Sequence, residues 1–449
     1  MNCAERSSEF DYVEAHRHFM MSWSPQSKHS EPVIVGGSGC YLEDIHGKRY
    51  FDFSSGWMCS NLGHCHPIIN DAIKRQLDAI SYVPPYLTSN IRAQFSKRLC
   101  QLAEFPNGAR VHFTTGGGDA NDDACRIARR FTGRHKILSA YRSFHGDTSG
   151  SAALTGGNRR WGAEPAVMPG VTRFFAPMPY RSPFFTDDPD EEVDRALEHL
   201  ERVIGQEGAS NIAAIIIEPV LGSDGLVVYP EGYLEGLAAI AKANGILVIH
   251  DEVMCGFGRT GEMFATKRLG LDPDIITFAK GVTGAYVPLG GVLMGEEVAS
   301  FYDETPFNSG HTYSGHPLAM AAGMGTLDAF ETGDHFRSGF QIEKWLGEGL
   351  DEIQSRHPIV GDVRGIGAFF AIELVKDRET KEPVVAWQSP MPQQMNEFCR
   401  ELMLSGLWLY TKHNLLIFAP PLICTQKEIE IHLGEFEEIL SKYEERLVA

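Results

Sequence analysis

The sequence predicts an α/β fold, in which a mostly parallel sheet of about seven strands is covered by helices and accompanied by a smaller α+β domain. Short β-rich runs alternate with stretches of helical periodicity through the middle of the chain. Several of these runs are apolar on both faces, which is typical of parallel strands buried between layers of helices. A chain of 449 residues is also too long for one simple core, so a second domain is expected.

The expected strands of the sheet are residues 110–114, 136–140, 171–176, 212–217, 246–250, 275–278 and 291–294. Helical patterns separate them along the chain. After the first strand, one apolar stripe recurs at helical spacing: Ala120, Ala124, Ile127, Ala128 and Phe131. This alternation places the sheet between about residues 65 and 325.

The pattern changes after residue 330. A long amphipathic stretch is followed by an apolar run at 365–375 and a proline-containing loop at 383–392. These features predict a C-terminal small domain of α+β type over residues 326–449. We expect residues 65–325 to form the large domain, and residues 1–64 to be an N-terminal segment that contributes to the small one.

Composition limits the partners and the location of the protein. The net charge of −19 argues against nucleic acid, whose phosphates require a basic surface. The chain has no 18-residue apolar run, and Glu5, Arg6 and Glu9 stand where a signal peptide needs an apolar core. Its nine cysteines form no C-x-x-C pair and are expected to be reduced thiols. We therefore predict a cytoplasmic protein that binds neither membranes nor nucleic acid.

A lysine and an aspartate suggest the cofactor. Lys280 follows the strand at 275–278 and lies 29 positions (280 − 251) after Asp251, which closes another apolar run. A buried lysine with a lowered pKa can form a Schiff base with the aldehyde of pyridoxal phosphate (PLP). A carboxylate can keep the pyridine nitrogen of PLP protonated. Alone, the two residues could equally be a surface lysine and an ordinary strand-end aspartate.

A glycine run lies between the first strand and the helix with the apolar stripe. Gly116, Gly117 and Gly118 precede that helix, where backbone N–H groups and the helix dipole can hold a phosphate. The run matches neither the Walker motif nor the dinucleotide-binding motif. A tight turn is the alternative, but beside Asp251 and Lys280 the run is a natural seat for the PLP phosphate.

Two further loops have features of a cofactor site. In the segment 141–146, Phe144 follows the second strand and could stack on the pyridine ring, or could be a core residue. In the segment 310–317, Thr312 could complete the phosphate site, or the segment could simply cap a helix. We expect no metal site, because His64, Cys65 and His66 are adjacent and point in different directions.

Together these residues resemble the class III (ω-type) aminotransferases of PLP fold type I, the aspartate-aminotransferase-like fold. The likeness runs nearly end to end. Its most specific part is Asp251-Glu252-Val253, then the segment 256–261, then Lys280. The other matching residues are Gly39, Tyr41, Asp44, Gly47, Asn61, Gly63, His64, Pro67, Pro420, Pro421 and Leu422.

The resemblance implies a role for each cofactor-binding residue. Lys280 would be the Schiff-base lysine, and Asp251 would pair with the pyridine nitrogen. Val253 would pack against the ring face opposite Phe144. The remaining residues of the implied cofactor site are Gly117, Gly118, His145, Glu218 and Thr312. Because Thr312 would reach the phosphate of the neighbouring subunit, the resemblance implies a homodimer or tetramer with the active site at the subunit interface.

Departures from the family bear on the keto acid. Members that use glutamate or 2-oxoglutarate often have a second glutamate where this chain has Ser223. Many members have a carboxylate-binding arginine where this chain has Tyr410, and the nearest cation is Lys412. Either Lys412 or Arg142 could hold a keto-acid carboxylate, or both could be solvated charges. These differences favour pyruvate over 2-oxoglutarate as the acceptor.

The resemblance implies a PLP-dependent aminotransferase that moves an amino group from an amine or ω-amino donor to a keto acid by a ping-pong mechanism. We expect Trp57, Met58, Phe144 and Trp161 to line the donor pocket. The segments 141–146 and 154–161 also look like those of taurine:pyruvate-type members, so Arg142, Arg159 or Lys412 could hold a sulfonate. The alternatives are a mutase, racemase, decarboxylase or phospho-lyase of the same fold, or a catalytically silent, ligand-sensing homologue.

Overall fold

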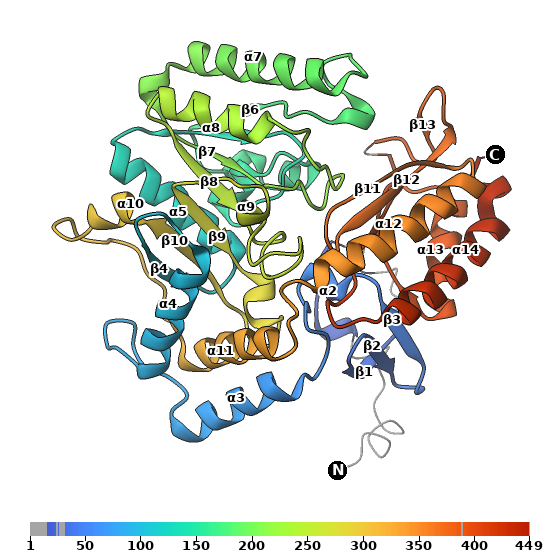
Figure 1. Cartoon of the computed structure of the whole chain (residues 1–449), viewed down its shortest axis with the longest axis horizontal. Coiled ribbons are helices and arrows are strands. Elements are labelled where there is room, and N and C mark those ends of the chain that lie inside the picture. Colours follow the sequence, from blue (N-terminus) through green and yellow to red (C-terminus); the bar gives the residue numbers. More distant parts are fainter. Residues whose placement is uncertain (1–15, 24–25, 27–31, 388, 449) are drawn as a thin grey trace.

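The centre of the molecule is a seven-stranded sheet (Figure 1). It is seen in a computed structural model that describes residues 16–23, 26, 32–387 and 389–448. The order of the strands across the sheet is β4-β10-β9-β8-β7-β5-β6. Their bounds are β4 Ala109–Thr114, β5 Lys136–Ala140, β6 Val171–Phe174, β7 Ile212–Ile217, β8 Leu247–Asp251, β9 Ile275–Phe278 and β10 Gly290–Gly295.

The strands β5 to β9 run parallel, and β10 is antiparallel to both of its neighbours. The predicted fold of a seven-stranded, mostly parallel sheet is therefore confirmed. The parallel strands are buried on both faces, and all six residues of β7 are inaccessible to solvent. Within β7, Ile215 and Ile217 join one core cluster while Ile216 joins another, because successive side chains point to opposite faces.

Helices cover both faces of this sheet (Figure 1). The side chains of α7 and α8 share a core cluster with Ile215 and Ile217, and those of α5 share the cluster with Ile216. The helices associated with the sheet are α3 Pro67–Ala79, α4 Asn90–Ala103, α5 Gly117–Thr132, α6 Ser149–Leu154, α7 Pro189–Glu207, α8 Tyr233–Ala243, α9 Ala265–Arg268, α10 Glu296–Ser300 and α11 Pro317–Thr332.

The N-terminal and C-terminal parts of the chain form two smaller sheets. One has the order β1-β2-β3-β14 and the other β11-β12-β16-β15, with β13 paired to β12. Because β14 pairs in parallel with β3, the segments 49–52 and 407–408, far apart in the sequence, lie side by side. The strands are β1 Ile34–Ser38, β2 Tyr41–Asp44, β3 Arg49–Asp52, β11 Val360–Gly365, β12 Phe370–Asp377, β13 Glu382–Pro383, β14 Leu407–Trp408, β15 Tyr410–Lys412 and β16 Leu415–Phe418. The helices here are α2 Ser55–Met58, α12 Ser338–Arg356, α13 Gln393–Ser405 and α14 Gln426–Val448.

A buried arginine joins these parts. Arg259 is fully buried, and its guanidinium donates to the carbonyls of Ala368 and Pro420 and to the side chains of Ser55 and Asn61. Burial lowers the pKa of Arg259 to about 10. Its four partners come from the N-terminal and C-terminal parts, so one side chain ties both to the loop that follows β8.

Two further observations concern the predicted location of the protein. No helix in the described part of the chain is long and apolar enough to cross a membrane. Every cysteine in that part is free. The residues that argue against a signal peptide, Glu5, Arg6 and Glu9, lie outside the described residues.

Candidate active site

Asp251 and Lys280 lie at the same edge of the central sheet. Asp251 is the last residue of β8 and pairs in register with Thr277 of the parallel neighbour β9. Lys280 comes two residues after β9 and begins the short turn Lys280–Thr283 with a φ of +46°. Such a backbone conformation is uncommon for a residue other than glycine and is often found at functional sites. Burial lowers the pKa of the Lys280 ammonium, which favours the free amine.

Three groups hold the Asp251 carboxylate. Its Oδ2 accepts a hydrogen bond from Asn121 Nδ2 at 2.8 Å and lies 2.7 Å from His145 Nδ1. Its Oδ1 accepts from the backbone N–H of Val253 at 3.0 Å. Asn121 also accepts from the Thr277 hydroxyl at 2.6 Å, so it links two neighbouring strands to α5. The sequence does not predict this role, although Asn121 stands one helical turn after Gly117.

Glu218 follows β7 and supports the segment that carries Phe144. Its carboxylate accepts from the backbone N–H of Phe144 at 2.9 Å and of Gly222 at 3.0 Å. Burial raises the pKa of Glu218 to about 7, although the nearby His145 acts in the opposite direction. We call Asn121, His145, Glu218, Asp251 and Lys280 the strand-end cluster.

The N-terminus of α5 lies beside this cluster. The helix begins at Gly117, and no side chain caps its first turn. A Cβ atom at position 117 would lie 3.0 Å from both methyl groups of Val253, two residues after Asp251. Glycine therefore leaves room at a helix end whose N–H groups can hold an anion. With the amine of Lys280 and the carboxylate of Asp251 nearby, these residues fit a phosphate-bearing pyridoxal cofactor.

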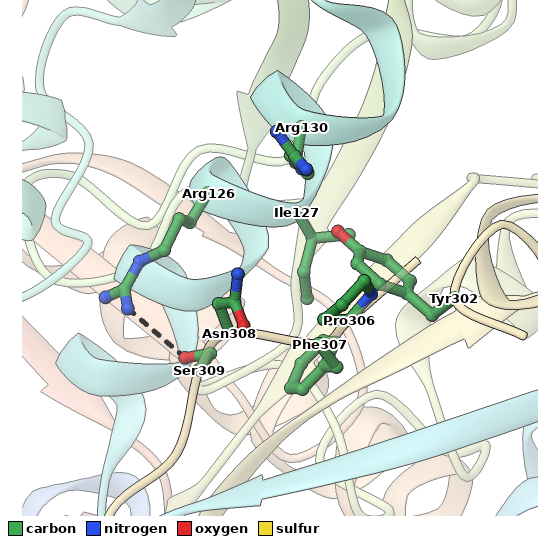
Figure 2. Close-up of a pocket in the computed structure, with 8 residues that line it drawn as sticks. All are labelled: Arg126, Ile127, Arg130, Tyr302, Pro306, Phe307, Asn308 and Ser309. Carbon is green, nitrogen blue, oxygen red and sulfur yellow. Dashed lines mark hydrogen bonds between the residues drawn. The ribbon is translucent and has the colours of Figure 1, made fainter. Parts of the chain in front are cut away.

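Thr312 is exposed in the single chain. The carbonyl of Thr312 accepts a hydrogen bond from the Tyr82 hydroxyl at 3.0 Å. A second hydrogen bond, 2.6 Å long, from the Ser309 hydroxyl to the Asp123 carboxylate holds the same segment against α5. A cavity of about 200 Å³ lies beside Ser309, and none of the predicted site residues lines it (Figure 2). The contact of Thr312 with a neighbouring subunit stays a prediction.

Arg159 occupies an aromatic frame, which we define as Trp23, Trp57, Phe144 and Tyr410. Its guanidinium carbon lies 4.8 Å from the ring centroid of Phe144 and 4.9 Å from that of Trp23. Its Nη2 donates to the Tyr410 hydroxyl at 2.9 Å. Trp57 and Tyr410 meet edge to face, with 6.0 Å between centroids. Three predicted pocket residues, Trp57, Phe144 and Tyr410, are therefore brought together around this cation.

The other predicted pocket residues lie in different surroundings. Met58 is buried in a core cluster, while the side chain of Trp161 is half exposed. The guanidinium of Arg142 stacks on Trp387, with 4.2 Å from its carbon to the ring centroid. The ammonium of Lys412 forms an ion pair with the carboxylate of Asp224, a residue that belongs to no sequence motif.

Comparison with known proteins decides the family. The family model "Aminotransferase class-III" matches residues 23–440 of the sequence. The chain is a class III aminotransferase. Its cofactor is PLP, and its fold is PLP fold type I, so the predictions of fold, enzyme class and cofactor are confirmed.

Relatives of this aminotransferase differ in the substrates that their names state. The solved taurine:2-oxoglutarate aminotransferase of Bifidobacterium kashiwanohense, in complex with PLP and glutamate, is 37% identical, with a TM-score of 0.93 and coverage of 98% of this chain and 100% of that one. An (S)-enantioselective ω-transaminase from Thermomicrobium roseum is 32% identical, with a TM-score of 0.90 and coverage of 96% and 98%. Adenosylmethionine-8-amino-7-oxononanoate aminotransferase of Geobacter sulfurreducens is 34% identical over 91% of this chain and 92% of its own.

Proposed function

We propose that this aminotransferase takes its amino group from a small ω-amino acid of the taurine type and passes it to pyruvate in a ping-pong reaction. The observation that carries the proposal is the position of Arg159, a cation beside Phe144 within the aromatic frame. A guanidinium offers paired donors that suit a sulfonate or carboxylate. The likeness to the solved taurine:2-oxoglutarate aminotransferase supports the same substrate class.

The strand-end cluster supports the chemistry of amino transfer. PLP, when bound, supplies an electron sink for the substrate bond that breaks. The N–H groups of Gly117 and Gly118 would hold its phosphate, and Asp251 would keep a proton on its ring nitrogen. The Lys280 amine, whose pKa burial lowers, is suited to accept a proton from the substrate carbon and return it.

The charges around the aromatic frame favour a keto acid with one carboxylate. Tyr410 is uncharged, and the charge of Lys412 is already balanced by Asp224. Arg159 then serves the acidic group of the donor in one half-reaction and that of pyruvate in the other. The alternative acceptor is 2-oxoglutarate, which the relative from Bifidobacterium is named for.

We further propose a homodimer in which Thr312 of each subunit completes the phosphate site of the other. Two observations support this assembly. The side chains of Thr312 and Tyr313 are exposed in the single chain, and the hydrogen bond from Ser309 to Asp123 holds their segment against the helix that begins at the phosphate site.

A half-reaction tests the proposed function. The visible absorbance of the PLP enzyme is followed while taurine, β-alanine, 4-aminobutyrate, an aliphatic diamine and an arylalkylamine are added separately. We expect taurine or another acidic ω-amine to convert the cofactor to its amino form, and pyruvate to restore the band more efficiently than 2-oxoglutarate. If substrate is consumed while the amino form never accumulates, the enzyme is a lyase, racemase, mutase or decarboxylase. Conversion by the arylalkylamine alone contradicts the assigned donor class.

A further inference from the structure

Asp224 and Lys412 form a buried ion pair beside the aromatic frame. The side chain of Asp224 is 2% exposed and that of Lys412 is 11% exposed. The two residues come from separate parts of the fold, since Asp224 lies in the loop after β7 and Lys412 ends β15. A buried carboxylate in contact with an ammonium cancels most of the charge of the ammonium. Removing one partner of such a pair costs free energy, because it leaves the other charge buried without a partner.

The position of Lys412 on its strand directs it toward the substrate side. Tyr410 and Lys412 are two residues apart on β15, so their side chains leave the same face of the strand. Tyr410 contacts Arg159, and Lys412 contacts Asp224. Arg142 is close to Lys412 as well, because both lie over the ring of Trp387. The guanidinium carbon of Arg142 is 4.2 Å from the ring centroid, and the ammonium of Lys412 is 6.0 Å from it. Three cations therefore gather where the acidic end of a substrate is expected.

The loop that carries Asp224 is closely fitted to the segment that carries Arg159. A Cβ atom at Gly157 would lie 2.1 Å from Asp224 Oδ2, so the carboxylate packs directly on the backbone two residues before Arg159. Two backbone hydrogen bonds between Leu221 and Val227 close the loop that contains Asp224. A fixed carboxylate is thus placed among the three cations.

We propose that Asp224 determines substrate specificity by taking up the charge of Lys412, which leaves Arg159 as the cation that binds a single acidic group. A keto acid with a second carboxylate could use Lys412 only by displacing Asp224 from a buried ion pair. The proposal rests on the proposed function in one respect, namely that the acidic group of the substrate binds at Arg159. It explains how a site with three cations can prefer a substrate with one acidic group.

The test uses the PLP enzyme and two unreactive acids, butyrate with one carboxylate and glutarate with two, whose dissociation constants are measured by calorimetry. Asp224→Asn keeps the size of the side chain and leaves Lys412 without a counter-charge. The constants are measured at about pH 6, where the Lys412 ammonium is protonated even though burial and the neighbouring arginines lower its pKa to about 7. We expect this variant to bind glutarate about tenfold more tightly while the affinity for butyrate changes less than about twofold. Lys412→Met leaves the Asp224 carboxylate unbalanced and should weaken the binding of both acids.

The double variant Asp224→Asn/Lys412→Met supplies the control. It replaces the ion pair by neutral groups and should bind both acids as the unaltered enzyme does. If Asp224→Asn binds both acids more weakly, or if the double variant keeps the gain for glutarate, Asp224 does not set specificity through Lys412. Should Asp224→Asn fail to fold, Lys412→Met and the double variant still decide, since equal affinities in these two would overturn the proposal. Failure of the proposed function would be separate: Arg159→Gln would then bind butyrate as tightly as the unaltered enzyme.

Discussion

Asp251, Glu218 and Lys280 each stand within two residues of the end of a strand in the central sheet. In contrast, Arg159 comes from the short 3-10 helix Asn158–Gly162, Asp224 from a loop and Lys412 from a strand of another sheet. In the strand-end cluster, the register of parallel strands places the side chains. In the aromatic frame, contacts between distant segments place Arg159, whose partner Tyr410 is 251 positions away. The first arrangement depends on the fold that the whole family shares, and the second depends on loops that can vary with the substrate.

The largest effect should come from the strand-end cluster. Replacement of Lys280 by alanine removes the amine that we propose as the group that transfers the substrate proton, so we expect the rate of amino transfer to fall at least about a thousandfold. The fall should be the same for every donor, because the step is common to all of them. Single-turnover absorbance measurements with several donors check this. Lys344→Ala, which alters an exposed lysine, is the matched control. A loss confined to acidic donors would contradict the assignment of Lys280.

The aromatic frame should show a smaller and selective effect. Arg159→Gln removes the cation and its bond to Tyr410, and we expect kcat/KM for an acidic ω-amine to fall about tenfold to a hundredfold. Any activity toward an arylalkylamine, which has no acidic group, should be nearly unchanged. Arg159→Lys keeps the charge without the paired donors, so its kcat/KM for the acidic ω-amine should lie between those of the unaltered enzyme and Arg159→Gln. Equal losses with both donors would mean that Arg159 only supports the fold.

The same contrast explains how much could be predicted from sequence. The positions of Asp251 and Lys280 at strand ends could be predicted because apolar runs mark where strands end, and the glycine run could be placed before a helix because an apolar stripe marks that helix. The roles of these residues toward PLP come from the family likeness and stay predictions. Adjacent pocket residues were harder to assign: Trp57 is 40% exposed in the aromatic frame, whereas Met58 is buried in the core. Asp224 belongs to no motif, and only the folded structure brings its carboxylate to Lys412. Long-range contacts between loops leave no periodic pattern in the sequence.

The smallest effect concerns Glu218, which connects the two regions because it ends a strand and also holds the backbone of Phe144. Burial raises its pKa to about 7 in the folded protein, above the 4.5 that is usual for the exposed group. The folded state therefore keeps the proton longer than the unfolded state does, and stability falls as the pH rises from the lower value to the higher one. Between about pH 6 and about pH 7.5 we expect this group to lower the free energy of unfolding by on the order of 1 kcal/mol. Glu218→Gln should remove that part of the decline, which denaturant unfolding at several pH values would measure.

Glu252→Gln is the matched comparison, because burial raises the pKa of Glu252 to about 7 as well, although its carboxylate binds Ala265 and Thr266 instead of Phe144. If both variants flatten the pH dependence but only Glu218→Gln changes the affinity for acidic donors, then Glu218 links the strand-end cluster to the aromatic frame. If neither variant flattens it, the carboxyl of Glu218 is ionised throughout, and the pH dependence of stability arises elsewhere.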